Sequence, residues 1–168
     1  MSLYPLPNLL LFQDFEGNWK IYCKAIYQEF LDNVVCRITF LGLPVKCKYL
    51  QPINNMHRSF WHIITENKHN SLKDEDRVPD FRRCERIRWI SHIINNFDHS
   101  DIKCWENERS GNKNVVLWLM SENYMIILSK RKDYYLLTTA YINDKITREK
   151  NLKEIKSSID PRKAGNAL

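Results

Sequence analysis

Two groups of side chains in this sequence could do chemistry on a phosphate. His62 is a candidate general acid or base, because the unperturbed pKa of histidine lies near physiological pH. Arg82, Arg83 and Arg86 span about one helical turn, so at least two can point the same way, and guanidinium groups match phosphate oxygens. The ordinary alternatives are a half-buried strand histidine and a solvated arginine face paired with Glu85.

The positive charge is concentrated in the later part of the chain. The formal net charge is +6, and of the 26 lysines and arginines 7 lie in residues 1–70 and 19 follow. Lys130, Arg131 and Lys132 form a compact cluster in a turn that could bind backbone phosphates, or simply keep the turn soluble. Such a field attracts polyanions, so we expect a nucleic-acid partner.

Several other classes of protein lack their minimum motifs here. The five cysteines are an odd number without a C-x-x-C pair, which argues against a disulfide framework and a zinc knuckle. The acidic residues 74–76 adjoin one another instead of converging from separate strands, so we expect no metal and no other cofactor. We also expect no signal peptide and no membrane span, and therefore a protein of the cytoplasm.

The elements that must position these residues begin with a helix and a hairpin. Apolar residues recur at helical spacing over 18–35, and two β-prone runs at 37–41 and 45–50 flank a Gly-Leu-Pro turn. The apolar run 59–65 predicts a short strand that would carry His62. The polar stretch 66–76 predicts an exposed loop or lid.

The second half predicts a helix and then a sheet. Pro79 and Asp80 open a helix with an isoleucine stripe on one side and arginines elsewhere. A change to period two then predicts four strands with short joints, typical of an antiparallel meander, at 102–105, 115–120, 124–129 and 134–141. A helix around 148–159 would end at Pro161.

This order of elements resembles the barnase, EndoU, colicin and RelE superfamily of ribonucleases, in its phage-associated branch. The likeness covers roughly residues 37–153. It is carried by Arg86, Ile87, Trp89 and Ile90 in the helix, by the tyrosine strand 124–128, and by Leu-Thr-Thr-Ala-Tyr at 137–141.

The resemblance implies an α+β fold of the RelE and barnase type, with N-terminal helices packed on an antiparallel sheet. Residues 1–36 would be a helical extension of the same unit, 37–156 the nuclease domain, and 157–168 a flexible tail. At 168 residues one domain is expected in any case.

The implied activity is that of a toxin-like, metal-independent endoribonuclease. The ribose 2′-hydroxyl attacks its own phosphate, which needs a base near that oxygen and cations on the phosphorane, and leaves a 2′,3′-cyclic phosphate. His62 would be the acid or base, with His57 as its rival. Arg83, Arg86 and Thr139 would hold the phosphate.

The closing strand would line the cleft. Thr139 and Tyr141 are two residues apart and share a face, whereas Thr138 points the other way. The resemblance implies that Tyr141 stacks a base, although threonine and tyrosine also favour strands without any function. Further substrate contacts would come from Arg82 and from the turn cluster Lys130, Arg131 and Lys132.

The implied partners are RNA and an antitoxin or immunity protein, and such a toxin could also be delivered into a target cell's cytoplasm. Two other hypotheses stay open. One is a module of the same fold that binds RNA without cleaving it. The other is an adaptor or effector whose interface is the front segment 1–36.

Overall fold

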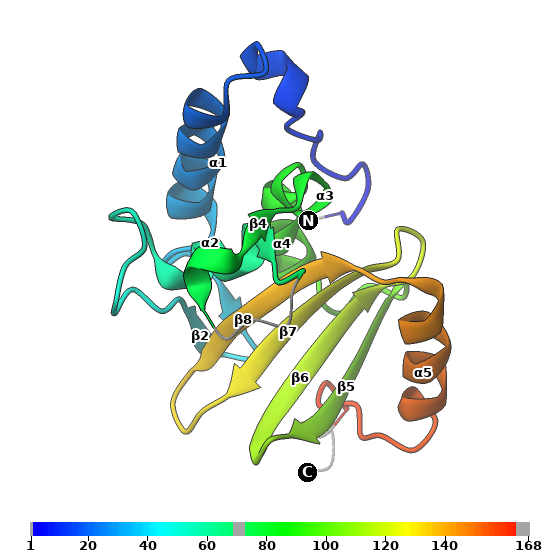
Figure 1. The fold of residues 1–168 in the computed structure, drawn as a ribbon. Coiled ribbons are helices and arrows are strands. Elements are labelled where there is room, and N and C mark those ends of the chain that lie inside the picture. Colours follow the sequence, from blue (N-terminus) through cyan, green and yellow to red (C-terminus); the bar gives the residue numbers. More distant parts are fainter. Residues whose placement is uncertain (1, 69–72, 164–168) are drawn as a thin grey trace.

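The fold is α+β, with helices packed around one six-stranded mixed sheet (Figure 1). The structure is a computed structural model that describes residues 2–68 and 73–163. The strand order is β1-β2-β8-β7-β6-β5, and the sheet curls into a half-barrel. The strands are β1 (Thr39–Phe40), β2 (Leu43–Lys46), β5 (Ile102–Arg109), β6 (Asn112–Leu119), β7 (Tyr124–Lys130) and β8 (Tyr135–Ile142).

The predicted four-stranded meander is confirmed in β5 to β8, and its first three strands are longer than expected. Ser110 and Gly111 form a two-residue turn with positive φ at both positions (51° and 73°), the geometry that suits a tight hairpin. A bulge interrupts the pairing of β7 with β8: Ile127 faces Thr139 and Leu128 faces Leu137, which leaves Thr138 as the extra residue.

The sheet is not wholly antiparallel, which corrects the expected architecture. β1 and β2 form the predicted hairpin, but β2 then pairs parallel with β8, with Val45 opposite Tyr135. A parallel neighbour needs a long crossover, and here the chain from β2 to β8 includes α2, α3, α4 and the first three meander strands. Local sequence patterns carry no sign of such a distant pairing.

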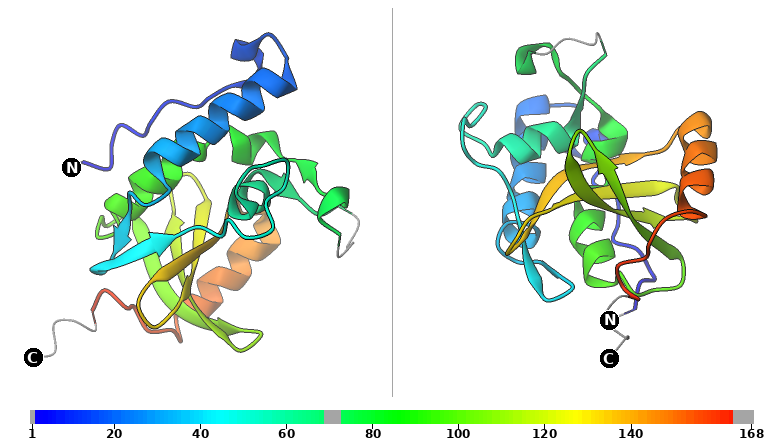
Figure 2. Two further views of the ribbon diagram at one scale, coloured as in Figure 1. Left: turned by 90° about the vertical axis from the view of Figure 1, so that its left-hand side faces the viewer. Right: turned by 90° about the horizontal axis from the view of Figure 1, so that it is seen from below.

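The inner face of the sheet carries the main core. Leu117, Ile126 and Leu137 are buried there, in one cluster with residues of α1 (Trp19–Asn33) and α4 (Ile87–Asn95), such as Phe30 and Ile90. Figure 2 shows these helices on the same side of the sheet. The periodic apolar stripes of both helices therefore pack where the sequence predicted.

The front segment belongs to this core. The Trp89 indole donates to the Pro7 carbonyl at 2.8 Å, and the Tyr22 hydroxyl donates to the Leu10 carbonyl at 2.8 Å. Leu3 is fully buried. The chain before α1, including the short 3-10 turn Phe12–Phe15, is thus packed along α4 and α1.

The expected strand over residues 59–65 is wrong. This segment is α2 (Arg58–Ile64), and only Thr65 continues as strand, in β3 (Thr65–Glu66), which pairs with β4 (Val78–Pro79). Phe60, Ile63 and Ile64 are buried at i, i+3 and i+4, the spacing of one helical face. A short apolar run fits either period, and packing of this face into the core selects the helix.

The loop and helix that follow also differ in detail. The predicted loop contains a 3-10 turn at Asp74–Asp76, and its residues 69–72 lie outside the described part of the chain. The predicted long helix starts after Asp80, whose side chain accepts from the Arg82 amide at 3.0 Å. It is interrupted at Arg86, giving α3 (Phe81–Cys84) and α4.

The outer face of the sheet carries a smaller apolar cluster at one end. Trp105, Val116, Trp118 and Met125 pack there under Ile155 of α5 (Lys145–Ile155). The described start of the expected tail, residues 157–163, lies against β5, where the Glu106 amide donates to the Ile159 carbonyl at 2.9 Å. Residues 164–168 lie outside the described chain.

Candidate functional site

His62 lies in an open cavity beside β8. The cavity has a volume of about 200 Å³, and its lining includes Lys48, Arg58 and Thr138. The His62 Nε2 is 3.0 Å from Asp74 Oδ1, and the other oxygen of Asp74 forms an ion pair with Arg58. Because α2 buries its apolar face, its polar residues Arg58 and His62 are left on the side toward β8.

The surroundings of His62 favour the neutral imidazole. Partial burial lowers its pKa, the nearby Arg77 lowers it further, and the Asp74 carboxylate opposes both. An ionised carboxylate can only accept a hydrogen bond, so the His62 Nε2 donates to Asp74. The Nδ1 lone pair of the neutral ring is then available to accept a proton.

Two arginines converge on Thr65, just after α2. Arg77 donates from Nε to the Thr65 hydroxyl at 2.8 Å and from Nη2 to the Thr65 carbonyl at 2.7 Å. Arg83 Nη1 donates to the same carbonyl at 3.0 Å, and its Nε lies 3.4 Å from the buried Asp80 carboxylate. Arg77, just before β4, and Arg83, on α3, therefore place two guanidinium groups at the C-terminal end of α2.

Arg83 also reaches the closing strand. Its guanidinium carbon is 5.6 Å from the centre of the Tyr141 ring. Burial raises the pKa of the Tyr141 hydroxyl, and Arg109 and Arg83 each lower it, so both cations lie near this ring. The pairing with β7 puts Thr139 on the same face as Tyr141, because their partners Ile127 and Met125 are also two residues apart.

The structure thus brings three of the predicted residues together and separates others from them. Arg83, Thr139 and Tyr141 gather on the outer face of β8, and His62 lies next to Thr138 on the same strand. Arg86 instead donates to the Arg82 carbonyl at 2.9 Å and lies 5.0 Å from the Trp89 ring. The Arg82 side chain is 65% exposed and forms an ion pair with Asp80 at 3.5 Å.

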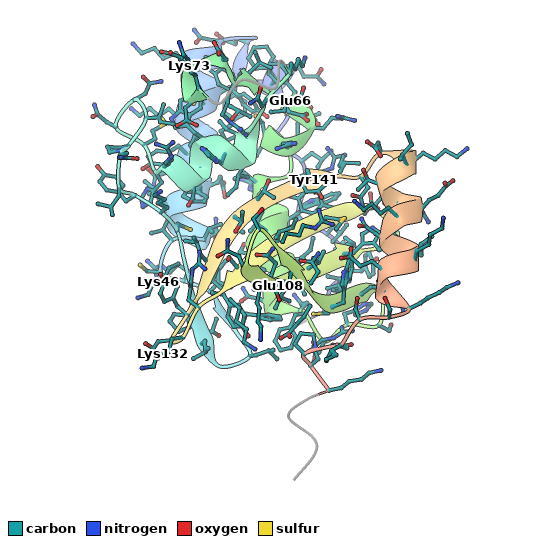
Figure 3. All side chains as sticks on the ribbon, turned by 60° about the horizontal axis from the view of Figure 1, so that its bottom comes forward. Lys46, Glu66, Lys73, Glu108, Lys132 and Tyr141 are labelled. Carbon is teal, nitrogen blue, oxygen red and sulfur yellow. The ribbon has the colours of Figure 1, made fainter. Side chains whose placement is uncertain are left out.

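The predicted turn cluster lies at the other end of β8. Figure 3 shows Lys132 at the opposite end of this strand from Tyr141. Lys130 pairs with Glu106 at 3.2 Å, and Arg131 donates to Asn112 at 3.0 Å. These bonds tie the turn to β5 and β6.

The rival histidine has a different environment. His57 Nδ1 is 2.8 Å from the Tyr27 hydroxyl, and its ring lies against Tyr49 and Phe30. Burial lowers its pKa. These contacts give His57 a packing role between α1 and the start of α2.

Three residues of this region were missed in the sequence. Asp74 lies in the polar loop and Arg77 directly follows it, where charge alone gave no reason to single them out. Arg109 was placed in a turn, but it is the last residue of β5 and reaches the neighbourhood of Tyr141. The period-two pattern, extended to the Ser-Gly turn, would have put Arg109 on the face of Trp105.

Comparison with protein-family models, curated proteins and solved structures gives no match. Within residues 2–68 and 73–163, no three His, Cys, Asp or Glu side chains are grouped as metal ligands would be. No helix in the same residues is long and apolar enough to cross a bilayer.

Proposed function

We propose that this protein is a metal-independent endoribonuclease, related to the barnase and RelE type of fold. The observation that carries the proposal is the His62 environment. A neutral imidazole is bonded to a carboxylate, lies in an open cavity beside β8, and has the cations Lys48, Arg58 and Arg77 nearby. A positioned base with an orienting carboxylate and nearby guanidinium groups is what transesterification of RNA requires.

The reaction follows from these positions. His62 Nδ1 takes the proton of a ribose 2′-hydroxyl, and the 2′-oxygen attacks the adjacent phosphorus. Arg83, with Lys48 at the cavity, stabilises the extra negative charge of the phosphorane, whereas Arg58 stays ion-paired with Asp74. The bond from phosphorus to the 5′-oxygen breaks, the departing oxygen takes a proton from solvent, and a 2′,3′-cyclic phosphate remains.

One observation favours the second candidate, a module that binds RNA without cleaving it. Arg77 and Arg83 already donate to the carbonyl groups of His62 and Thr65, so part of their hydrogen-bonding capacity holds the fold. Arginine has five N–H donors, and the remaining ones can still contact phosphate. The protein would bind RNA without cleaving it if these donors and His62 could not contact the same phosphate at the same time.

The test is incubation of the purified protein with total cellular RNA in EDTA, beside His62→Gln and a matched His57→Gln variant. We expect discrete cuts with cyclic-phosphate ends, lost in His62→Gln and kept by a folded His57→Gln protein. If the unmodified protein leaves the RNA intact, the enzyme hypothesis is overturned in favour of the binding module. Cutting that persists in His62→Gln would overturn the assignment of the base.

An inhibitory partner is part of the proposal. A nuclease acting on the RNA of its own cell must be restrained, and an acidic protein would be attracted to the cations along β8. RNA and such an inhibitor would then compete for one surface. Competition can be read as loss of RNA binding when the inhibitor is added.

A further inference from the structure

A second cavity opens on the outer face of the sheet, between the end of β8 and α5. Its volume is about 230 Å³. Val116, Met125 and Ile127 line it with apolar atoms, Tyr141 contributes an aromatic ring, and Thr147 comes from α5. Tyr141 also contacts Arg83, so this cavity adjoins the proposed phosphate site.

Asn107 lines this cavity, and one of its polar atoms lacks a partner. The Asn107 Oδ1 is buried, and among the described residues it accepts no hydrogen bond. Its pairing with Asn114 puts Asn107 on the outer face, two residues from Trp105 and two from Arg109. A buried acceptor is costly to leave unsatisfied, so a ligand that donates to it would gain affinity.

Cations stand at the rim of the same cavity. Arg109 is 52% exposed and lies 3.5 Å from Glu154, and Lys150 is exposed on α5. The side chain of Asn151 donates to the Met125 sulfur at 3.0 Å, which holds α5 against the sheet next to this rim. Two positive groups beside a pocket lined by both apolar and polar side chains suit a flat ligand that has a hydrogen-bonding edge in one part and negative charge in another.

We propose that this cavity holds one unstacked adenine of a single-stranded RNA, next to the scissile phosphate. The ring of Tyr141 stacks on the base, and the Asn107 amide reads its edge. Asparagine pairs with adenine through two hydrogen bonds, accepting from the exocyclic amine and donating to a ring nitrogen. Arg109 and Lys150 contact the flanking phosphates.

The size of the cavity and its position set the substrate class. A volume of about 230 Å³ lies below the roughly 300 Å³ at which pockets for drug-sized ligands begin, and so fits one heterocycle. A base in a duplex is stacked on both sides and cannot enter, so the inference requires a single strand. This inference rests on the proposed function, because it names the substrate of the same surface.

The test is the affinity of fluorescein-labelled 2′-O-methyl hexanucleotides of A, U, C or G, measured by anisotropy. The methyl group blocks the nucleophile, so binding is read without cleavage. We expect the adenine oligomer to bind about 5- to 150-fold more tightly than the uracil oligomer. Asn107→Leu should remove this preference, while Asn112→Ala, on the neighbouring strand but outside the cavity, should keep it.

The stacking role has its own pair of variants. Tyr141→Leu should weaken binding of the adenine oligomer by about 5- to 150-fold, and Tyr141→Phe, which keeps the ring, should retain it. Equal affinity of the unmodified protein for all four oligomers would overturn the inference. So would an adenine preference that survives Asn107→Leu, or a preference for another base.

The two proposals fail in different ways. If the protein leaves total RNA intact but shows an adenine preference that depends on Asn107, the nuclease proposal is rejected and the base-pocket proposal stands. If cleavage depends on His62 but oligomer binding is unchanged by substitution of Asn107 or Tyr141, the nuclease proposal stands and the base-pocket proposal is rejected.

Discussion

The salt dependence of RNA binding should show how many cations along the outer face of β8 contact phosphate groups. Four positive side chains are in reach of a single strand that runs from the His62 cavity to the Asn107 cavity: Lys48, Arg83, Arg109 and Lys150. Each phosphate neutralised on a single strand contributes about −0.7 to the slope of log affinity against log salt. Four contacts give a slope of about −2.8, or about a 50-fold loss of affinity from 50 to 200 mM salt.

Single substitutions should change that slope in steps. Lys150→Gln should reduce it to about −2.1, which leaves about a 20-fold loss over the same salt range. Lys20→Gln is the matched control, because Lys20 is exposed on α1, which packs on the inner face of the sheet. Lys132→Gln should also leave the slope unchanged, since its turn lies at the far end of β8.

The assay is anisotropy of a labelled 2′-O-methyl hexanucleotide over a salt series, with each variant checked for cooperative unfolding. A slope near zero for the unmodified protein would refute the electrostatic reasoning. An equal reduction by Lys20→Gln and Lys150→Gln would show that the strand does not follow the outer face.

Three further predictions concern pH and stability. If neutral His62 is the base, the acid limb of the pH profile of kcat/KM should follow the His62 pKa. Arg77 lowers this pKa and Asp74 raises it, so the limb should move to higher pH in Arg77→Gln and to lower pH in Asp74→Asn. Movement in the same direction in both variants would contradict this. Leu117→Ala should lower the free energy of unfolding in urea by about 2 to 5 kcal/mol, because Leu117 is fully buried. Gly111→Ala should cost about 1 kcal/mol in the same assay, since φ is +73° there; an unchanged midpoint would contradict the strain.

The meander was the part of the fold most open to prediction. Alternation in four successive runs of four to eight residues is hard to mistake, and it puts Leu117 and Ile126, which pair in β6 and β7, on one face. The run 59–65 was not, because a seven-residue run with four apolar residues fits both a strand and one face of a short helix. The parallel pairing of β2 with β8 joins residues about ninety apart, which no local pattern records.

The site shows the same limit. Histidine chemistry and arginine spacing singled out His62 and Arg83, and strand alternation put Thr139 with Tyr141. The partner of His62 is Asp74, twelve residues away across a loop, and only the folded chain brings the two together. Arg83 and Arg86 were both expected on the phosphate from one helix, but the interruption at Arg86 turns that side chain toward Trp89.

The most direct test of the central claim uses a DNA oligonucleotide with a single adenine ribonucleotide, incubated in EDTA with the protein and with His62→Gln. If His62 draws a proton from a 2′-hydroxyl, the strand is cut once, on the 3′ side of the ribonucleotide, and the fragment carries a 2′,3′-cyclic phosphate. The all-DNA strand and the His62→Gln reaction should stay intact. Cleavage of the all-DNA strand, or no cleavage of the strand with the ribonucleotide, would contradict the account.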